Sequence, residues 1–218
     1  MHIWTLPVLG GTPRQLTDAP ARFRDWYPCW STDGETIAFM RSTSGENWAE
    51  AGEGNISVVS ADGCEPRRIT SESDRIFDAA PVMWSPDGKL LAYFSRDKRD
   101  APDGTIKVIP ATGGEPRIVT KVRGAFANKE MAWSPGNRRI AYNELRGDTT
   151  RIVSNMIKVV SLDDGSTEEI VPDLKDVKEI YHLDWSPDGK TLVFAGYTGG
   201  WPEFWTVGNF LPLARTER

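Results

Sequence analysis

Apolar and polar residues alternate with a period of two in short segments that recur about every 50 residues along the chain. Such segments begin at Ile37, Leu91, Ile140 and Leu192. Alternation of this kind predicts β-strands, because successive side chains of a strand point to opposite faces of the sheet. No helical periodicity of useful length is visible. We therefore expect an all-β chain.

A turn precedes each alternating segment, and each turn begins with a tryptophan. The turns read Trp, Ser, a small residue, then Asp-Gly, Gly-Asn or a close variant, and they begin at Trp30, Trp84, Trp133 and Trp185. Ser-Pro-Asp-Gly favours a type I turn that joins two strands of a tight hairpin, with Pro at its second position and Gly where φ is positive. Asn137 replaces Gly in the third copy, and Asn tolerates the left-handed region best among the alternatives.

A second hairpin follows in each repeat, with Gly-containing bends at Asp62-Gly63, Gly113-Gly114 and Asp164-Gly165. Each repeat is thus predicted to be four antiparallel strands, named a to d in chain order. One such sheet cannot cover both of its own apolar faces, so the repeats must stack, and radial stacking gives a β-propeller. We assign the four repeat tryptophans to the core between blades.

We treat the chain as a single propeller domain, 1–218. The predicted blade segments are 26–70, 80–120 and 128–171, which are complete, and 1–17 and 180–210, which are partial. The N-terminal segment offers strands c and d, whereas the C-terminal one already contains a, b and c. Because these ends do not complete one blade, we expect the chain to belong to a larger ring of six or seven blades.

The repeated segments Trp-Ser-Pro-Asp-Gly-Lys and Gly-Gly-Glu-Pro-Arg resemble the WD40-like repeat called PD40, known from the TolB family. The resemblance covers nearly the whole chain. It implies a β-propeller, and it implies a periplasmic or secreted location if the protein is TolB-like, although the chain shows no signal peptide. The same repeat occurs in periplasmic accessory proteins, in oligopeptidase propellers and beside bacterial signalling kinases. The sequence alone leaves the compartment open.

Composition argues against several classes of partner. The net charge is −5 and Lys and Arg are scattered, so no basic stripe for nucleic acid is present. No apolar run approaches the roughly 20 residues of a membrane span. Cys29 and Cys64 are predicted on strands that are not adjacent, which disfavours a disulfide.

Catalytic and metal-binding patterns are weak. The chain has no Gly-x-Ser-x-Gly and only two histidines, of which His182 lies on a predicted innermost strand and is expected to be partly exposed without a catalytic role. Asp97, Asp100 and Asp103 lack the spacing of a calcium loop. We expect no metal, no cofactor and no enzymatic activity from these residues, with any catalytic domain lying outside the chain.

The connections d–a and b–c, which share one face of a propeller, carry charged and aromatic side chains, and these types dominate binding hot spots. The alternative is that the aromatic groups simply pack blade against blade. The candidate binding residues are Arg24, Trp26, Tyr27, Trp48, Arg75, Phe77, Asp78, Phe126, Lys129, Glu130, Tyr181, His182, Tyr197 and Trp201.

Our first hypothesis is a non-enzymatic scaffold that binds a protein, a peptide or a small ligand on this face. The alternative is the accessory or sensor propeller of a larger enzyme, such as an oligopeptidase-like hydrolase or a signalling kinase. A minor alternative is a propeller lyase or glycan-acting enzyme that uses His182 and Glu130.

Overall fold

The structure is a computed structural model. It describes residues 1–43, 53–71, 76–77, 81–96, 101, 103–123, 130–148, 151–170, 177, 179–197 and 203–208. The chain divides into two compact units, Met1–Ala125 and Phe126–Arg218, and each is described by itself.

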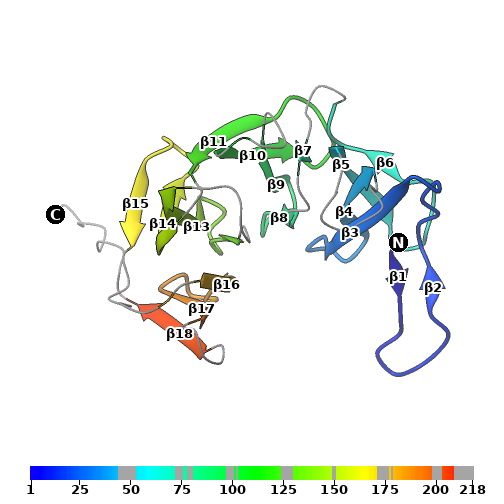
Figure 1. Cartoon of the computed structure of the whole chain (residues 1–218). Helices are drawn as coiled ribbons and strands as arrows, with labels where there is room; N and C mark the ends of the chain where they lie inside the picture. The colour runs from blue at the N-terminus through cyan, green and yellow to red at the C-terminus, as the bar shows by residue number, and fades with distance from the viewer. Residues whose placement is uncertain are drawn as a thin grey trace. The chain divides into compact units, whose positions relative to one another are not determined.

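The first unit contains a two-stranded sheet and two larger sheets, all antiparallel (Figure 1). The two-stranded sheet pairs β1 (Trp4–Thr5) with β2 (Arg14–Gln15). The first larger sheet has the order β3 (Phe23–Trp30), β4 (Thr36–Thr43), β5 (Glu53–Ser60), β6 (Arg67–Arg68), and β7 (Ile76–Phe77) also pairs with β5. The second has the order β8 (Met83–Trp84), β9 (Leu90–Ser95), β10 (Gly104–Pro110), β11 (Arg117–Val122).

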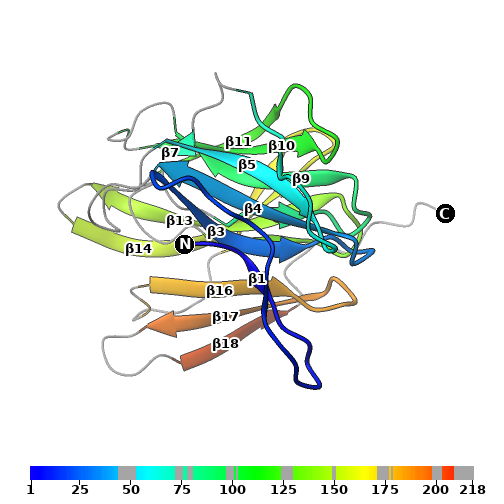
Figure 2. The same cartoon turned by 90° about the vertical axis from the view of Figure 1, so that its right-hand side faces the viewer.

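The second unit contains two antiparallel sheets. One has the order β12 (Met131–Trp133), β13 (Arg139–Asp148), β14 (Arg151–Ser161), β15 (Thr167–Ile170). The other has three strands, β16 (Glu179–Trp185), β17 (Thr191–Tyr197) and β18 (Glu203–Gly208), which lie side by side in Figure 2. Every described element of the two units is a strand, a turn or a loop, so the prediction of an all-β fold built from propeller blades is confirmed.

The a–b turns have the predicted geometry. Gly34, Gly88 and Gly189 have φ of 73°, 71° and 70°, and Asn137 has φ of 60°. In the Ser85 turn, the Gly88 N–H donates to the Ser85 carbonyl (2.8 Å), and Ser85 Oγ donates to Asp87 Oδ1 (2.7 Å). The local turn chemistry therefore closes each hairpin without help from the rest of the fold.

Buried apolar clusters lie between successive sheets within each unit. The largest in the first unit joins the β3–β6 and β8–β11 sheets through residues such as Met40, Ile56 and Tyr93. In the second unit, the corresponding cluster includes Trp185 and Phe194. A smaller cluster, formed by Ile3, Leu16, Ile37, Phe39 and Val59, packs the β1–β2 sheet on the β3–β6 sheet.

The repeat tryptophans do not all have the environment that the sequence predicts. Trp133 and Trp185 are 7% and 6% exposed, and Trp84 is partly buried against the core of the first unit. Trp30, however, is 52% exposed, so its assignment to the inter-blade core is wrong. The physical reason is that a repeat tryptophan packs on the first strand of the preceding blade, and only β1 and β2 are described before β3.

Candidate functional site

The described candidate residues lie mainly on the first strands of blades, and each unit is considered by itself. The structure places Arg24, Trp26 and Tyr27 on β3 of the first unit. In the second unit, Tyr181 and His182 lie on β16 and Tyr197 ends β17, while Glu130 directly precedes β12. Arg24, Trp26 and Tyr27, like Tyr181 and His182, thus lie within inner strands and not in the d–a connections where the sequence analysis placed them.

Tyr27 and His182 occupy equivalent positions, three residues before Trp30 and Trp185, and both have a positive φ. The values are 51° for Tyr27 and 53° for His182. Each lies where the register of the sheet shifts, between Trp26 and Cys29 in one blade and between Tyr181 and Asp184 in the other. A bulge of this kind re-aims a side chain, and a left-handed residue other than Gly is strained.

Both bulge side chains reach solvent. Tyr27 is 41% exposed, and His182 is exposed next to Tyr181, with the two ring centroids 6.4 Å apart. A phenol and an imidazole can each donate and accept hydrogen bonds. Each bulge therefore presents a polar aromatic group at a strained backbone position, and strained positions of this kind cluster at functional sites.

A buried ion pair supports the bulge of the first unit. Arg41 Nε donates to Asp25 Oδ1 (2.7 Å) and Arg41 Nη2 donates to Asp25 Oδ2 (2.9 Å), while the Asp25 side chain is fully buried. The hydrogen bond to Asp25 raises the pKa of Arg41 above its ordinary value. Since Asp25 pairs with Arg41 across β3 and β4, this bidentate contact fixes the backbone two residues before Tyr27.

The remaining candidates differ in how far the structure describes them. Trp26 is half-buried, and its indole nitrogen is buried with no hydrogen-bond partner among the described residues. Glu130 is fixed through its backbone, because its N–H donates to Asn143 Oδ1 (2.9 Å). Phe77 lies in β7 beside β5 instead of in a d–a connection. Outside the described residues lie Trp48, Arg75, Asp78, Phe126, Lys129 and Trp201.

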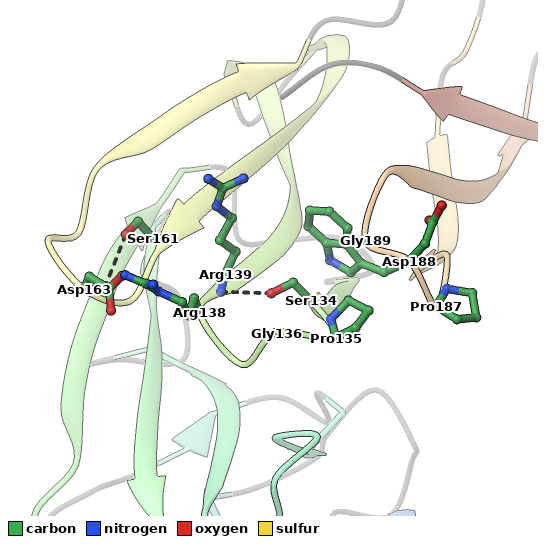
Figure 3. Close-up of a pocket in the computed structure, with 11 residues that line it drawn as sticks. Ser134, Pro135, Gly136, Arg138, Arg139, Ser161, Asp163, Pro187, Asp188 and Gly189 are labelled. Atoms are coloured by element: carbon green, nitrogen blue, oxygen red, sulfur yellow. Dashed lines mark hydrogen bonds and ion pairs between the residues drawn. The ribbon is translucent and has the colours of Figure 1, made fainter. Parts of the chain in front are cut away.

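A cavity of about 460 Å³ lies elsewhere in the second unit, between two a–b turns (Figure 3). The Ser134 turn and the Pro187 turn form its walls together with Arg138, Arg139 and Asp163. Arg138 makes an ion pair with Asp163, and Ser134 Oγ accepts a hydrogen bond from Arg139 N (3.1 Å). None of the predicted candidates is among the cavity-lining residues, and the sequence analysis missed this surface because it treated the bends only as turns.

The other sequence signal that was missed is the Pro-Arg motif in strand d. Arg14 Nη2 donates to the Ala61 carbonyl (3.2 Å), and Arg67 Nη1 donates to the Thr112 carbonyl (3.0 Å). Each arginine thus connects the outer strand of one blade to the c–d bend of the next. The recurrence of Arg directly after Pro in strand d is the sequence signal that indicates this link between blades.

Among the described residues, no cluster of three or more His, Cys, Asp or Glu side chains could hold a metal ion. In the same residues, no helix is long and apolar enough to cross a membrane. Cys29 and Cys64 are free thiols.

The chain resembles several known proteins, although no protein-family model matches it. A curated relative, the uncharacterized peptidase YuxL of Bacillus subtilis, is 27% identical over 197 residues, which cover 89% of this chain and 25% of the relative. A puromycin-hydrolyzing peptidase of Mycobacterium tuberculosis has a TM-score of 0.63 at 15% identity, covering 91% of this chain and 32% of that one. Oligogalacturonate lyase from Vibrio parahaemolyticus has a TM-score of 0.61 at 11% identity, covering 93% and 59%.

These likenesses define the class of the fold, and they change the functional interpretation. Solved structures at such low identity show only that the sheets are blades of a β-propeller. The chain spans about a quarter of the length of the curated relative it matches. The expectation that the protein is not an enzyme is overturned by the curated relative, which is named a peptidase. The relatives are peptidase-related propeller proteins.

Proposed function

We propose that this chain is the propeller of an oligopeptidase-like hydrolase, built from repeats of the PD40 type. The observation that carries the proposal is the alignment of 89% of the chain with a quarter of a curated peptidase. In this function the propeller screens peptides on their way to the reacting groups, so its inner strands contact the substrate before cleavage.

The bulges at Tyr27 and His182 support this function. A peptide entering a propeller passes the first strands of the blades, and extended peptides offer backbone N–H and C=O groups to polar side chains. An exposed phenol and an exposed imidazole, each held at a strained backbone position, are suited to such transient contacts. They orient or delay the peptide without taking part in bond cleavage.

The experiment is a peptide-hydrolysis assay on the whole protein that contains this chain. A mixture of unmodified peptides of graded length is incubated with it, and the products are identified by mass spectrometry. The proposal expects cleavage of short peptides. The absence of any cleavage by a preparation with an intact β-sheet circular dichroism spectrum contradicts it.

Variants of the bulges test the proposed role of the propeller. Tyr27→Ala and His182→Ala should change KM for peptides more than kcat, because their side chains contact substrate outside the reacting centre. Ile118→Ala serves as the control, since Ile118 is 57% exposed on β11, a strand that pairs with neither bulge strand. If all three variants have the same KM and kcat as the parent, Tyr27 and His182 do not contact the substrate.

The likeness to oligogalacturonate lyase favours a second candidate, a propeller lyase with His182 and Glu130 near the channel. Lyase cleavage of a uronate chain forms an unsaturated sugar that absorbs in the ultraviolet. Growth of that absorbance on incubation with oligogalacturonate, and its loss in His182→Ala and Glu130→Ala, would favour the lyase over the peptidase.

A further inference from the structure

The a–b turns of the blades share one pattern of hydrogen bonds, and the Ser134 turn departs from it. In the Ser85 turn, the serine hydroxyl donates to Asp87 Oδ1 (2.7 Å), and the Lys89 N–H donates to the same oxygen (3.1 Å). Two further turns are closed in the same way by the carboxylates of Asp33 and Asp188. Each of these three turns therefore binds a carboxylate through one hydroxyl and one backbone N–H.

The Ser134 turn has Gly136 where the other turns have aspartate. Ser134 Oγ still accepts a hydrogen bond from Arg139 N (3.1 Å), as the pattern requires. Among the described residues, however, neither the Ser134 hydroxyl proton nor the Arg138 N–H has an acceptor. Ser134 is only 7% exposed, so its hydroxyl is buried beside the cavity that it lines. The turn thus retains both donors of a carboxylate site and lacks the carboxylate.

The other turns show that this position favours an anion. The Ser85 hydroxyl, and then the Lys89 N–H, lower the pKa of Asp87 below its ordinary value. The same two kinds of donor, in the same order, lower the pKa of Asp33 and of Asp188. A Cβ added to Gly136 would meet no heavy atom of the described residues within 4 Å. The position is therefore open to a carboxyl group.

The Ser134 turn also carries an additional cation. Arg139 aligns with Leu90 and Thr191 of the neighbouring repeats, so this repeat gains a positive charge where it loses a negative one. The Arg139 residue is half-buried, and its guanidinium has no partner among the described residues. Figure 3 shows its side chain along one wall of the cavity of about 460 Å³, opposite the Pro187 turn. This volume is in the range of small-ligand sites.

The other charged side chains that line the cavity are already compensated. Arg138 makes an ion pair with Asp163. Hydrogen bonds within its own turn, and then the positive charge of Lys190, lower the pKa of Asp188 and hold its carboxylate in the ionised form. Within the described lining of the cavity, Arg139 is thus the cation that remains available to an anion.

We propose that this cavity binds a ligand carboxylate in the place of the aspartate that the Ser134 turn lacks. Ser134 Oγ and the Arg138 N–H donate to the ligand carboxylate, and Arg139 contributes a favourable positive charge. The apolar part of the lining comes from Pro135, Pro187 and Trp185. The ligand therefore carries an apolar group beside its carboxylate.

A carboxylate of this kind belongs to the C-terminus of a peptide or to an acidic side chain, and three small probes distinguish these sources. They are N-acetyl-leucine, its primary amide, and the α-amide of N-acetyl-aspartic acid, whose carboxylate is on the side chain. Binding of each to the whole protein is measured by isothermal titration calorimetry. We expect N-acetyl-leucine to bind about tenfold more tightly than its amide, because the amide lacks the charge. Tighter binding of the aspartyl probe than of N-acetyl-leucine would indicate a side-chain carboxylate, and the reverse order a C-terminus.

Variants of the turn test the assignment of the donors. Gly136→Asp supplies the carboxylate that the other turns have, so it should weaken binding of N-acetyl-leucine by about tenfold or more. Gly136→Ala is the matched control, because it adds the Cβ without the charge, and it should leave the affinity unchanged. Arg139→Leu copies Leu90 of the Ser85 turn and should also weaken binding.

Three results would overturn the proposal. They are the absence of binding by both carboxylate probes, equal binding of N-acetyl-leucine and its amide, and an unchanged affinity in Gly136→Asp. Hydrogen exchange of the unmodified protein covers the case in which a variant fails to fold. The Arg138 N–H should exchange more slowly with N-acetyl-leucine bound, and an unchanged rate overturns the proposal. A protein that cleaves no peptide can still pass these tests, so they are independent of the proposed peptidase function.

Discussion

Removal of the Trp185 side chain is the sharpest test of the packing between blades. The side chain is 6% exposed and belongs to the core cluster of the second unit. A buried Trp removes roughly 200 Å² from water, which at about 25 cal/mol per Å² corresponds to roughly 5 kcal/mol. Because alanine retains part of the burial and the cavity relaxes in part, we expect Trp185→Ala to cost about 3–5 kcal/mol.

A second variant of Trp185 separates the contribution of ring packing from that of the indole hydrogen bond. Trp185→Phe retains a ring but leaves the Ala132 carbonyl without the donor that it has at 3.1 Å. An unsatisfied buried acceptor costs about 1–3 kcal/mol, so this variant should lie between the parent and the alanine variant. Trp30→Ala is the matched control, since a side chain 52% exposed should lose less than about 2 kcal/mol in the same chain.

The assay is urea unfolding followed by far-ultraviolet circular dichroism, with hydrogen exchange of the β12 and β16 amides as a local probe. Exchange is needed because the chain has two compact units and unfolding in one step is not guaranteed. If Trp185→Ala and Trp30→Ala lose the same free energy of unfolding, the assignment of Trp185 to an inter-blade core is refuted.

Three further perturbations test the local reasoning. Gly104→Ala should cost about 1–3 kcal/mol in thermal unfolding, because the added Cβ would clash with the Phe94 ring and lie 2.8 Å from the Ser95 carbonyl oxygen. Gly136→Ala is the control, since Gly136 has open space around it. A loss of stability no larger than that of the control would argue against crowding at Gly104. Asn137→Gly should be neutral or stabilise the protein by up to about 1 kcal/mol, because the φ of residue 137 is 60° and glycine adopts this value without strain. Asn137→Val should destabilise the protein for the opposite reason. A higher melting temperature for the Val variant than for the Gly variant would contradict the left-handed turn. The Ser85 hydroxyl and then the Lys89 N–H lower the pKa of Asp87, so its stabilising contribution is complete above the unfolded pKa of about 4 and is lost as pH falls through the lower folded value. Asp87→Asn should therefore flatten the acid limb of the stability profile, and an unchanged limb in acid titration of unfolding would disprove the contribution.

The elements that the sequence predicts well are those with local causes. The turn at Ser85 needs only its own residues, because Asp87 binds the Ser85 hydroxyl and the Lys89 N–H while Gly88 supplies the positive φ. The same chemistry recurs at Ser31 and Ser186. Together with the period-two alternation of the strands, it was sufficient to predict the blades.

The parts that the sequence does not predict depend on neighbouring strands. The positive φ of Tyr27 and His182 arises from register shifts between two strands, and neither residue type requires such a backbone. β7 pairs with β5 at Glu53 and Gly54, outside the stretch of β5 that pairs with β6, and nothing in the local sequence of β7 indicates this partner. The exposure of Trp30 depends on what precedes β3 in space, so an identical repeat motif has two different environments.

The functional interpretation changed for a related reason. The rim of aromatic and charged side chains suggested a scaffold without enzymatic activity, because no catalytic motif occurs in the sequence. The curated relative, which is named a peptidase, aligns with 89% of this chain over only a quarter of its own length. Motifs within the repeats report on the blades and say little about the chemistry of the protein that contains them.

The most direct test of the proposed function compares one peptide in two settings. The whole protein is incubated with the free peptide and with the same sequence inside a folded carrier protein, and cleavage is measured by mass spectrometry. An oligopeptidase-like hydrolase with a screening propeller predicts cleavage of the free peptide and an intact carrier. Cleavage of both at the same rate, or of neither, contradicts the account.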